Sequence, residues 1–191
     1  MHETHKALAP HQQVWLAALE EYARRHPDES DSLQPFRAFV SVHRDAAERQ
    51  LAIGHLTGSA WLVSADGKRV LLTHHKKLGR WLQLGGHADG DVDLARAALR
   101  EAEEESGLRD LVVEPQIFDL DRHAIPARGH DAEHWHYDVR YVVRASGSEA
   151  FAVSDESHAL AWRNIAEIAE DTDTDPSLRR MAEKWLALRN A

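Results

Sequence analysis

The sequence predicts an α/β protein of the α+β type, with a mixed β-sheet sandwiched between helices and a helical extension before it. Its 191 residues exceed the roughly 150 residues of an average domain, which suggests one domain plus an extension. After Gly54, strand-like and helix-like segments interleave without the regular alternation of a doubly wound sheet. We therefore expect an N-terminal helical extension over residues 1–50 and a main domain over residues 51–191 that includes a C-terminal helix.

Composition narrows the class of protein. Hydrophobic residues make up 43% and charged residues 29% of the chain, which is ordinary for a globular domain and excludes wholesale disorder. The excess of 32 acidic over 23 basic residues gives a net charge of −9, which argues against nucleic-acid or anionic-membrane partners. No apolar run approaches the roughly 20 residues of a membrane-spanning helix. The absence of cysteine excludes thiolate chemistry and fits the cytoplasmic location that we expect.

The first fifty residues show helical periodicity. Trp15, Leu19 and Tyr22 recur at helical spacing, and Pro27 ends the run. A second helix is predicted with Pro35 in its first turn. The apolar side chains of these helices need burial, so the helices could cap a cleft or form a homodimer interface. Two exposed linkers are expected, at residues 28–32 and 172–175.

The remaining elements follow from turn and strand signals. A strand at 57–64 leads through a hairpin turn at 65–68 into a strand at 69–75. A helix is predicted from about Asp91 to Ser106, and Gly107 is placed to end it. Further strands are expected at 81–84, 111–120, 134–144 and about 159–162. A loop is expected at 121–133, and a short helix precedes a last helix that begins near Pro176.

The predicted helix 91–106 carries the most informative side chains. Glu101, Glu104 and Glu105 share one helical face, although like charges at this spacing destabilise a helix by about 0.2–0.5 kcal/mol per pair. Hard oxygen donors of this kind suit Mg²⁺ or Mn²⁺. A glutamate-rich helix on its own is usually a solvated acidic face. The preceding Gly85-Gly86 pair favours a binding site instead.

The stretch from Gly86 to Leu108 resembles the signature of the Nudix hydrolase family. Gly86 takes the first position, and the run from Arg100 to Leu108, which holds Arg-Glu, Glu-Glu and Gly at the required places, fills the second half without a gap. One position departs, because the first glutamate of the signature falls on Val92. That departure concerns the support of the loop before the helix and leaves the metal-binding half intact.

The resemblance implies an enzyme that cleaves a phosphorus anhydride. Such enzymes hydrolyse a diphosphate bond in a nucleoside diphosphate derivative by attack of metal-activated water on phosphorus. By resemblance, Glu101, Glu104, Glu105 and the carbonyl of Gly85 would bind Mg²⁺ or Mn²⁺. Arg100 would orient the glutamates as part of the catalytic set. The family's sheet pattern extends loosely from about residue 57 to 169.

Polar residues outside the signature are further candidates. In the predicted strand 134–144, His134, His136, Asp138 and Arg140 alternate onto one face. Glu133 and His134 are candidates for a general base or an extra metal ligand. His87 and Arg80 could contact substrate phosphates. The candidate substrate-binding residues are therefore His87, Arg80, Glu133, His134 and His136.

The His-x-His pattern at 134–136 also permits a zinc site. Two histidines on one strand face can supply two of the usual three protein ligands. The third ligand could come from His123, His130 or Asp138.

Alternatives to the hydrolase stay open. A Nudix-like domain could bind a nucleotide as a sensor without cleaving it, and Val92 is the residue that favours this hypothesis. Isopentenyl diphosphate isomerase, a branch of the same fold, is disfavoured because its chemistry resembles one that uses a cysteine. A structural protein with an acidic helix would show no metal dependence. Nothing in the sequence selects one nucleoside diphosphate derivative.

Overall fold

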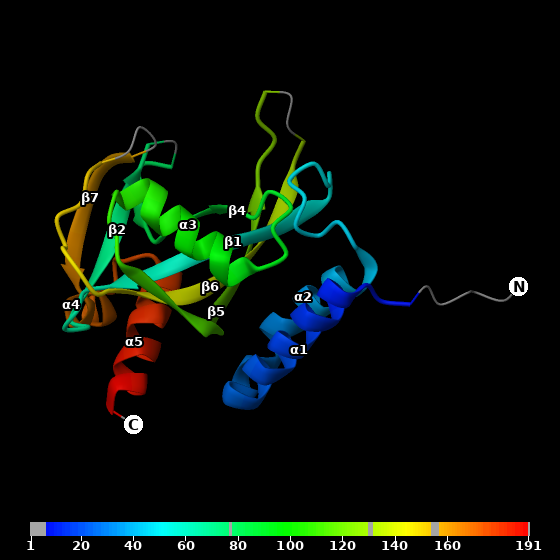
Figure 1. Ribbon diagram of the computed structural model, residues 1–191, viewed down its shortest axis with the longest axis horizontal. Coiled ribbons are helices and arrows are strands. Elements are labelled where there is room, and N and C mark those ends of the chain that lie inside the picture. Colours follow the sequence, from blue (N-terminus) through cyan, green and yellow to red (C-terminus); the bar gives the residue numbers. More distant parts are fainter. Residues whose placement is uncertain (1–6, 77, 130–131, 154–156, 191) are drawn as a thin grey trace, which may run out of the picture.

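The computed structural model describes residues 7–76, 78–129, 132–153 and 157–190. Helices and strands interleave along the chain (Figure 1). The elements are α1 (Pro10–Arg25), η1 (Pro27–Glu29), α2 (Ser30–Val42), β1 (Gly54–Val63), β2 (Arg69–His75), β3 (Arg80–Leu82), β4 (Leu84–His87), α3 (Leu94–Ser106), β5 (Leu111–Ile125), β6 (His134–Ala145), β7 (Ser157–Asn164), α4 (Ile165–Glu170) and α5 (Pro176–Asn190).

A seven-stranded mixed sheet forms the centre of the molecule. The strand order is β3-β2-β1-β6-β5, while β4 pairs with β1 and β7 pairs with β2. The pairing of β1 with β6 is parallel, and the other pairings are antiparallel. The mixed sheet predicted from the interleaved pattern is therefore confirmed.

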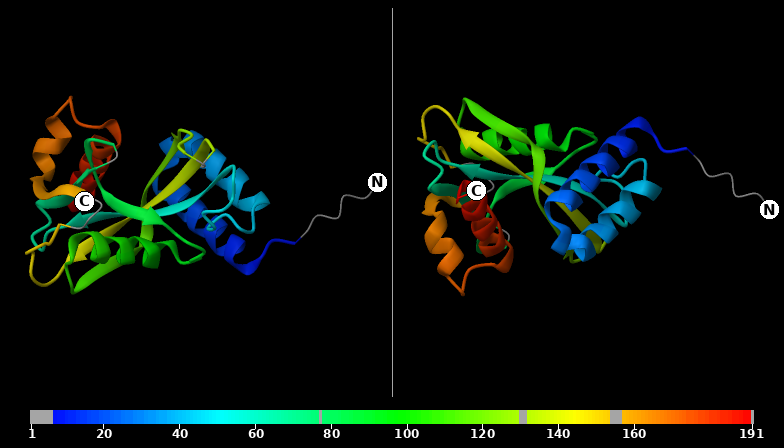
Figure 2. Two further views of the ribbon diagram at one scale, coloured as in Figure 1. Left: turned by 90° about the horizontal axis from the view of Figure 1, so that it is seen from above. Right: turned by 90° about the horizontal axis from the view of Figure 1, so that it is seen from below.

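Helices cover both faces of this sheet, and α3 and α5 lie on opposite sides of it (Figure 2). Alternation along β1 explains the arrangement. Ala60 and Leu62 pack in a core with Ala102 of α3, whereas Trp61 and Val63 pack in a core with α4 and α5. Gly58 lets α3 approach closely, because a Cβ there would stand 2.9 Å from the carbonyl oxygen of Leu94.

The N-terminal helices pack onto the sheet and share a core with it. Trp15, Phe36 and Phe39 are buried there with Tyr137 and Tyr141 of β6. The ring of Phe39 stacks on Tyr137 at a centroid distance of 4.0 Å. The apolar residues whose burial the sequence required are thus covered within one chain. Within the described residues, no helix has both the length and the apolar character needed to cross a membrane.

Three expectations about elements were wrong. Residues 28–32 are not a linker, because η1 runs directly into α2, which begins at Ser30 and carries Pro35 in its interior. The strand expected at 81–84 is split into β3 and β4. The expected loop 121–133 is partly strand, since β5 extends to Ile125 and pairs with β6 as far as His134. The linker expected at 172–175 does lie in the turn between α4 and α5.

Candidate functional site

Helix α3 is fixed at both ends by local signals that the sequence contains. The carboxylate of Asp93 accepts a hydrogen bond from the backbone N–H of Arg96 at 3.1 Å, which caps the first turn. Gly107 ends the helix in a left-handed conformation with φ of 68°. Ala97 and Ala98 are fully buried against the sheet. Their small side chains bring the helix close to β1 and place the glutamate face beside β4.

The three glutamates of α3 lie in different surroundings. Glu105 is only 8% exposed, and its Oε1 accepts a hydrogen bond from the backbone N–H of Gly85 at 2.8 Å. The carboxylate of Glu101 lies against Gly86, so a Cβ at that position would displace this carboxylate from its present place. Glu104 is exposed to solvent. The Gly85-Gly86 pair thus lets the glutamate face and β4 approach each other.

Arg100 joins this helix to the end of β4. Its Nη2 donates to the carbonyl oxygen of His87 at 2.8 Å and to Oε1 of Glu101 at 3.0 Å. One guanidinium therefore fixes a carboxylate and the adjacent backbone together. This geometry suits the orienting role that the sequence resemblance implies.

The chemistry of these donors fits Mg²⁺ or Mn²⁺, because carboxylate and carbonyl oxygens are the ligands that hard cations prefer. The glutamates are not gathered in advance, however. Among the described residues, the set of three or more donor groups that lie within 4.8 Å of one another consists of histidines and not of Glu101, Glu104 and Glu105. At least one of the three carboxylates would therefore have to move for all three to bind one ion.

The loop before α3 is supported from α1 and from the turn that follows α2. The indole Nε1 of Trp15 donates to the carbonyl oxygen of Val92 at 2.8 Å. The backbone N–H of Gly90 donates to the carbonyl oxygen of Ala47 at 3.0 Å. Within the loop, the Asp91 carboxylate pairs with Arg96 at 2.6 Å, and hydrogen bonding to Arg96 lowers the pKa of Asp91. The loop is thus held although the signature glutamate is absent.

The structure brings some of the other predicted residues together and separates the rest. His134 and His136 lie beside His55 and His87. Of the expected third zinc ligands, His123 contacts the ring of His136 at 5.5 Å, and His130 lies outside the described residues. Asp138 belongs to a different set of contacts, because its carboxylate accepts hydrogen bonds from the hydroxyls of Thr57 and Ser59 at 2.8 and 2.7 Å.

Arg80 and Glu133 lie near the surface. Arg80 forms an ion pair with Asp175, just before α5, at 3.1 Å, and its side chain is 57% exposed. Glu133 is exposed immediately before β6. Their predicted contacts with substrate stay predictions.

The sequence matches the family model described as NUDIX domain over residues 55–185. The chain belongs to the NUDIX family. The match begins in β1 and ends in α5, so it includes α3 and all of the sheet except Gly54, and it leaves α1 and α2 outside.

Solved structures show the same fold at low sequence identity. An Ap4A hydrolase from C. elegans is 17% identical, with a TM-score of 0.56 over 71% of this chain and 97% of that one. A MutT protein from Methanosarcina mazei Go1 is 16% identical, with a TM-score of 0.57 over 74% and 99%. An E. coli dihydroneopterin triphosphate pyrophosphohydrolase is 18% identical, with a TM-score of 0.55 over 71% and 96%. No curated protein matched the sequence. These likenesses establish the Nudix fold and leave the substrate open.

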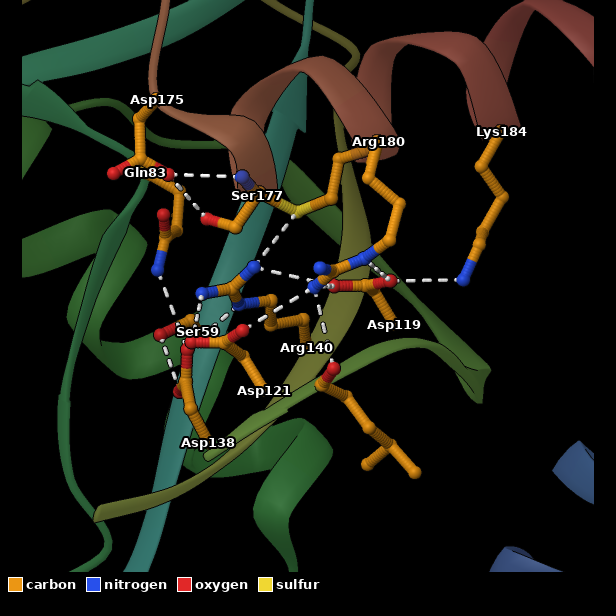
Figure 3. A network of polar contacts seen from close by, with 12 residues as sticks. Ser59, Gln83, Asp119, Asp121, Asp138, Arg140, Asp175, Ser177, Arg180 and Lys184 are labelled. Carbon is orange, nitrogen blue, oxygen red and sulfur yellow. Dashed lines mark hydrogen bonds and ion pairs between the residues drawn. The ribbon is translucent and has the colours of Figure 1, made fainter. Parts of the chain in front are cut away.

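The Nudix sheet of this chain also carries a buried ionic network on the side covered by α5 (Figure 3). Arg140 lies at its centre and donates through Nε to Asp138 at 2.7 Å and through Nη1 to Asp119 at 3.2 Å. From α5, Arg180 and Lys184 reach Asp119 at 2.7 and 2.8 Å. Burial alone would raise the pKa of Asp119, but the hydrogen bond from Arg180 and the nearby cations outweigh it and lower that pKa.

Sequence reasoning missed two residues of this region. His55 was overlooked because the predicted strand began at Thr57, whereas β1 begins at Gly54. A signal was present, since His55, Thr57 and Ser59 alternate in the manner of one strand face. Asp119 was assigned to a strand without a role, and nothing local marks a buried aspartate whose partners come from α5.

Proposed function

We propose that this chain is a magnesium-dependent Nudix hydrolase that cleaves a diphosphate bond in a nucleoside diphosphate derivative. The observation that carries the proposal is the clamp between α3 and β4. The Glu105 carboxylate accepts a hydrogen bond from the N–H of Gly85. Arg100 donates to the carbonyl oxygen of His87 and to the Glu101 carboxylate. A merely solvated acidic helix would have no need of these contacts.

The glutamates, Arg100 and the backbone of β4 would have different roles in the hydrolysis. When bound, Mg²⁺ would neutralise phosphate charge and lower the pKa of a water molecule that attacks phosphorus. Exposed Glu104 offers a carboxylate at the open side of the helix. Arg100 keeps the Glu101 carboxylate oriented, and such positioning and charge stabilisation supply most of the rate gain in phosphoryl transfer. Glu133 and His134 remain our candidates for a general base outside the helix.

The support of the loop at Val92 weighs against a purely binding domain. Val92 was the residue that favoured a sensor without turnover. Because Trp15 and Ala47 hold the backbone of that loop, its position does not depend on a glutamate side chain at residue 92. The machinery beyond the loop, Arg100 with Glu101 and Glu105, is present. This combination supports hydrolysis over binding alone.

The test is a panel of nucleoside diphosphate derivatives incubated with Mg²⁺, with the products separated by chromatography. We expect metal-dependent release of two phosphate-containing products from at least one compound. Glu104→Gln should lower kcat by about a hundredfold or more, because removing one stabilising group from a transition state costs that much in comparable sites. Glu103→Gln, one residue earlier on the helix, is the matched control and should keep near-parent turnover. Equal turnover in the parent and Glu104→Gln would contradict the metal-binding role.

A further inference from the structure

Five histidine rings gather at one end of the sheet, although they come from four strands. Pairing explains this: His55 of β1 lies opposite His136 of β6, and His136 lies opposite His123 of β5. His87 of β4 lies opposite Thr57, two residues beyond His55 on the same face. His134 is two residues before His136 and therefore shares that face. The centroids of neighbouring rings are 4.7–5.5 Å apart.

Three of these rings have the spacing of a metal site. One donor atom from each of His55, His87 and His136 lies within 4.8 Å of the others. The Nε2 atoms of His55 and His136 are 3.1 Å apart. Two nitrogens bound to one tetrahedral zinc at about 2.0–2.1 Å stand roughly 3.3 Å apart. The pair therefore needs almost no movement to hold such an ion.

The protonation of the rings also suits a metal. Burial, together with the neighbouring histidines, lowers the pKa of His55 to about 4 and lowers that of His136 as well. Both rings are therefore neutral near pH 7, as metal ligation requires. The two outer rings are oriented by oxygen atoms. Nδ1 of His134 lies 2.8 Å from the carbonyl oxygen of Ala132, and Nδ1 of His123 lies 3.2 Å from the carboxylate of Asp121. Because these oxygens can only accept, Nδ1 is the donor in each contact, which fixes the orientation of the ring.

We propose that His55, His87 and His136 form a zinc site distinct from the glutamate site on α3, with water as the fourth ligand. Three imidazoles with one open position are a common zinc environment, whereas Mg²⁺ prefers oxygen. Successive residues of β4 face opposite sides of the sheet, so the Glu101 carboxylate over Gly86 and the His87 ring in the histidine cluster lie on opposite faces of that strand. The zinc site does not rest on the proposed hydrolase activity.

A simple hydrogen bond between histidines explains less of this geometry. A neutral pair needs one N–H and one lone pair, which His55 and His136 alone supply. It gives no reason for a third donor atom within the same 4.8 Å. A metal ion that accepts lone pairs from all three rings accounts for it.

The test is a zinc titration of the full chain without an affinity tag, after treatment with EDTA, against a chromophoric zinc chelator. We expect one Zn²⁺ per chain. His87→Gln and His136→Gln should each weaken zinc binding by about a hundredfold, because loss of a direct ligand exceeds the roughly 10–100-fold cost of losing an outer-shell partner. His158→Gln removes an exposed histidine outside the cluster and should leave affinity unchanged. Glu104→Gln should also keep its zinc, which separates this proposal from the hydrolase proposal.

Cobalt provides a second measurement on the parent protein alone, so the outcome does not depend on whether a variant folds. Co²⁺ added to the EDTA-treated chain should give the intense visible absorption of tetrahedral coordination, and one equivalent of Zn²⁺ should abolish it. Circular dichroism of each variant shows that it is folded. Absence of zinc binding to the parent, or parent-like affinity in both His87→Gln and His136→Gln, overturns the proposal.

Discussion

Replacing Arg140 by methionine tests how the buried network holds the sheet to α5. Methionine keeps much of the volume of the side chain and removes its charge. The Arg140 side chain is 3% exposed, and the carboxylates of Asp138 and Asp119 that it contacts are 2% and 0% exposed. The substitution therefore leaves negative charge in a place that water does not reach.

The remaining contacts set the size of the effect. Removing one partner of a buried ion pair costs about 3–5 kcal/mol. Asp119 keeps Arg180 and Lys184, so its charge stays compensated. Asp138 keeps only uncharged donors in its described contacts, among them Thr57 and Ser59. We therefore expect the free energy of unfolding to fall by about 3 kcal/mol, near the lower end of this range. This corresponds to a fall in Tm of roughly 6–12 °C for a chain of this size.

The assay is denaturant unfolding at neutral pH, followed by circular dichroism, with a thermal scan beside it. Arg144→Met is the matched control, because Arg144 lies four residues later on β6 and its ion pair with Glu114 is 47% and 36% exposed. An exposed pair contributes at most about 1 kcal/mol, so this variant should stay close to the parent. If Arg140→Met unfolded at the same denaturant concentration as Arg144→Met, the reasoning from burial would be wrong.

Three further predictions follow from single contacts. Trp15→Phe removes the donor to the Val92 carbonyl and should cost about 1 kcal/mol, with faster amide hydrogen exchange in residues 88–93 than in the parent. Gly58→Ala places a methyl 2.9 Å from the Leu94 carbonyl oxygen and should cost about 1–3 kcal/mol by overpacking, measured by urea unfolding. Because the folded state lowers the pKa of Asp119 below the unfolded value of about 3.9, its contribution is present above that pH and is lost as pH falls further. Acid titration of Asp119→Asn should therefore show a shallower loss of stability below about pH 4 than the parent shows.

Local patterns in the sequence predict local structure well here. Helix α3 was expected from about Asp91 to Ser106, and the structure places it at Leu94–Ser106 with Gly107 at its end, as predicted. The hairpin of β1 and β2 was also expected, because turn residues and alternation are encoded within a short stretch. Extension of β5 through His123 was missed because a polar strand segment has the composition of a loop.

Contacts between distant segments could not be obtained in this way. The parallel pairing of β1 with β6 joins His55 to His136, which are 81 residues apart, and no turn signal encodes such a pair. The histidine pattern at 134–136 pointed to zinc. Its partners were then sought among residues close in the chain, whereas the structure supplies them from β1 and β4. Asp138 was expected on a polar strand face, as a possible zinc ligand. It is buried instead, and its carboxylate accepts hydrogen bonds from Thr57, Ser59 and Arg140.

Val92 shows how a departure from a family signature can be tolerated. In the family signature, the side chain of the first glutamate supports the loop before the helix. In this chain the support reaches the backbone instead, since Trp15 bonds the carbonyl oxygen of Val92 and Ala47 bonds the N–H of Gly90. Because these contacts use backbone atoms, they do not depend on which side chain is at residue 92. Consistent with this, Val92 is 46% exposed. Helix α1 and the turn after α2 lie outside the matched family region, yet they hold the loop that leads into α3. The proposed activity would therefore depend on this N-terminal region as well as on the matched one.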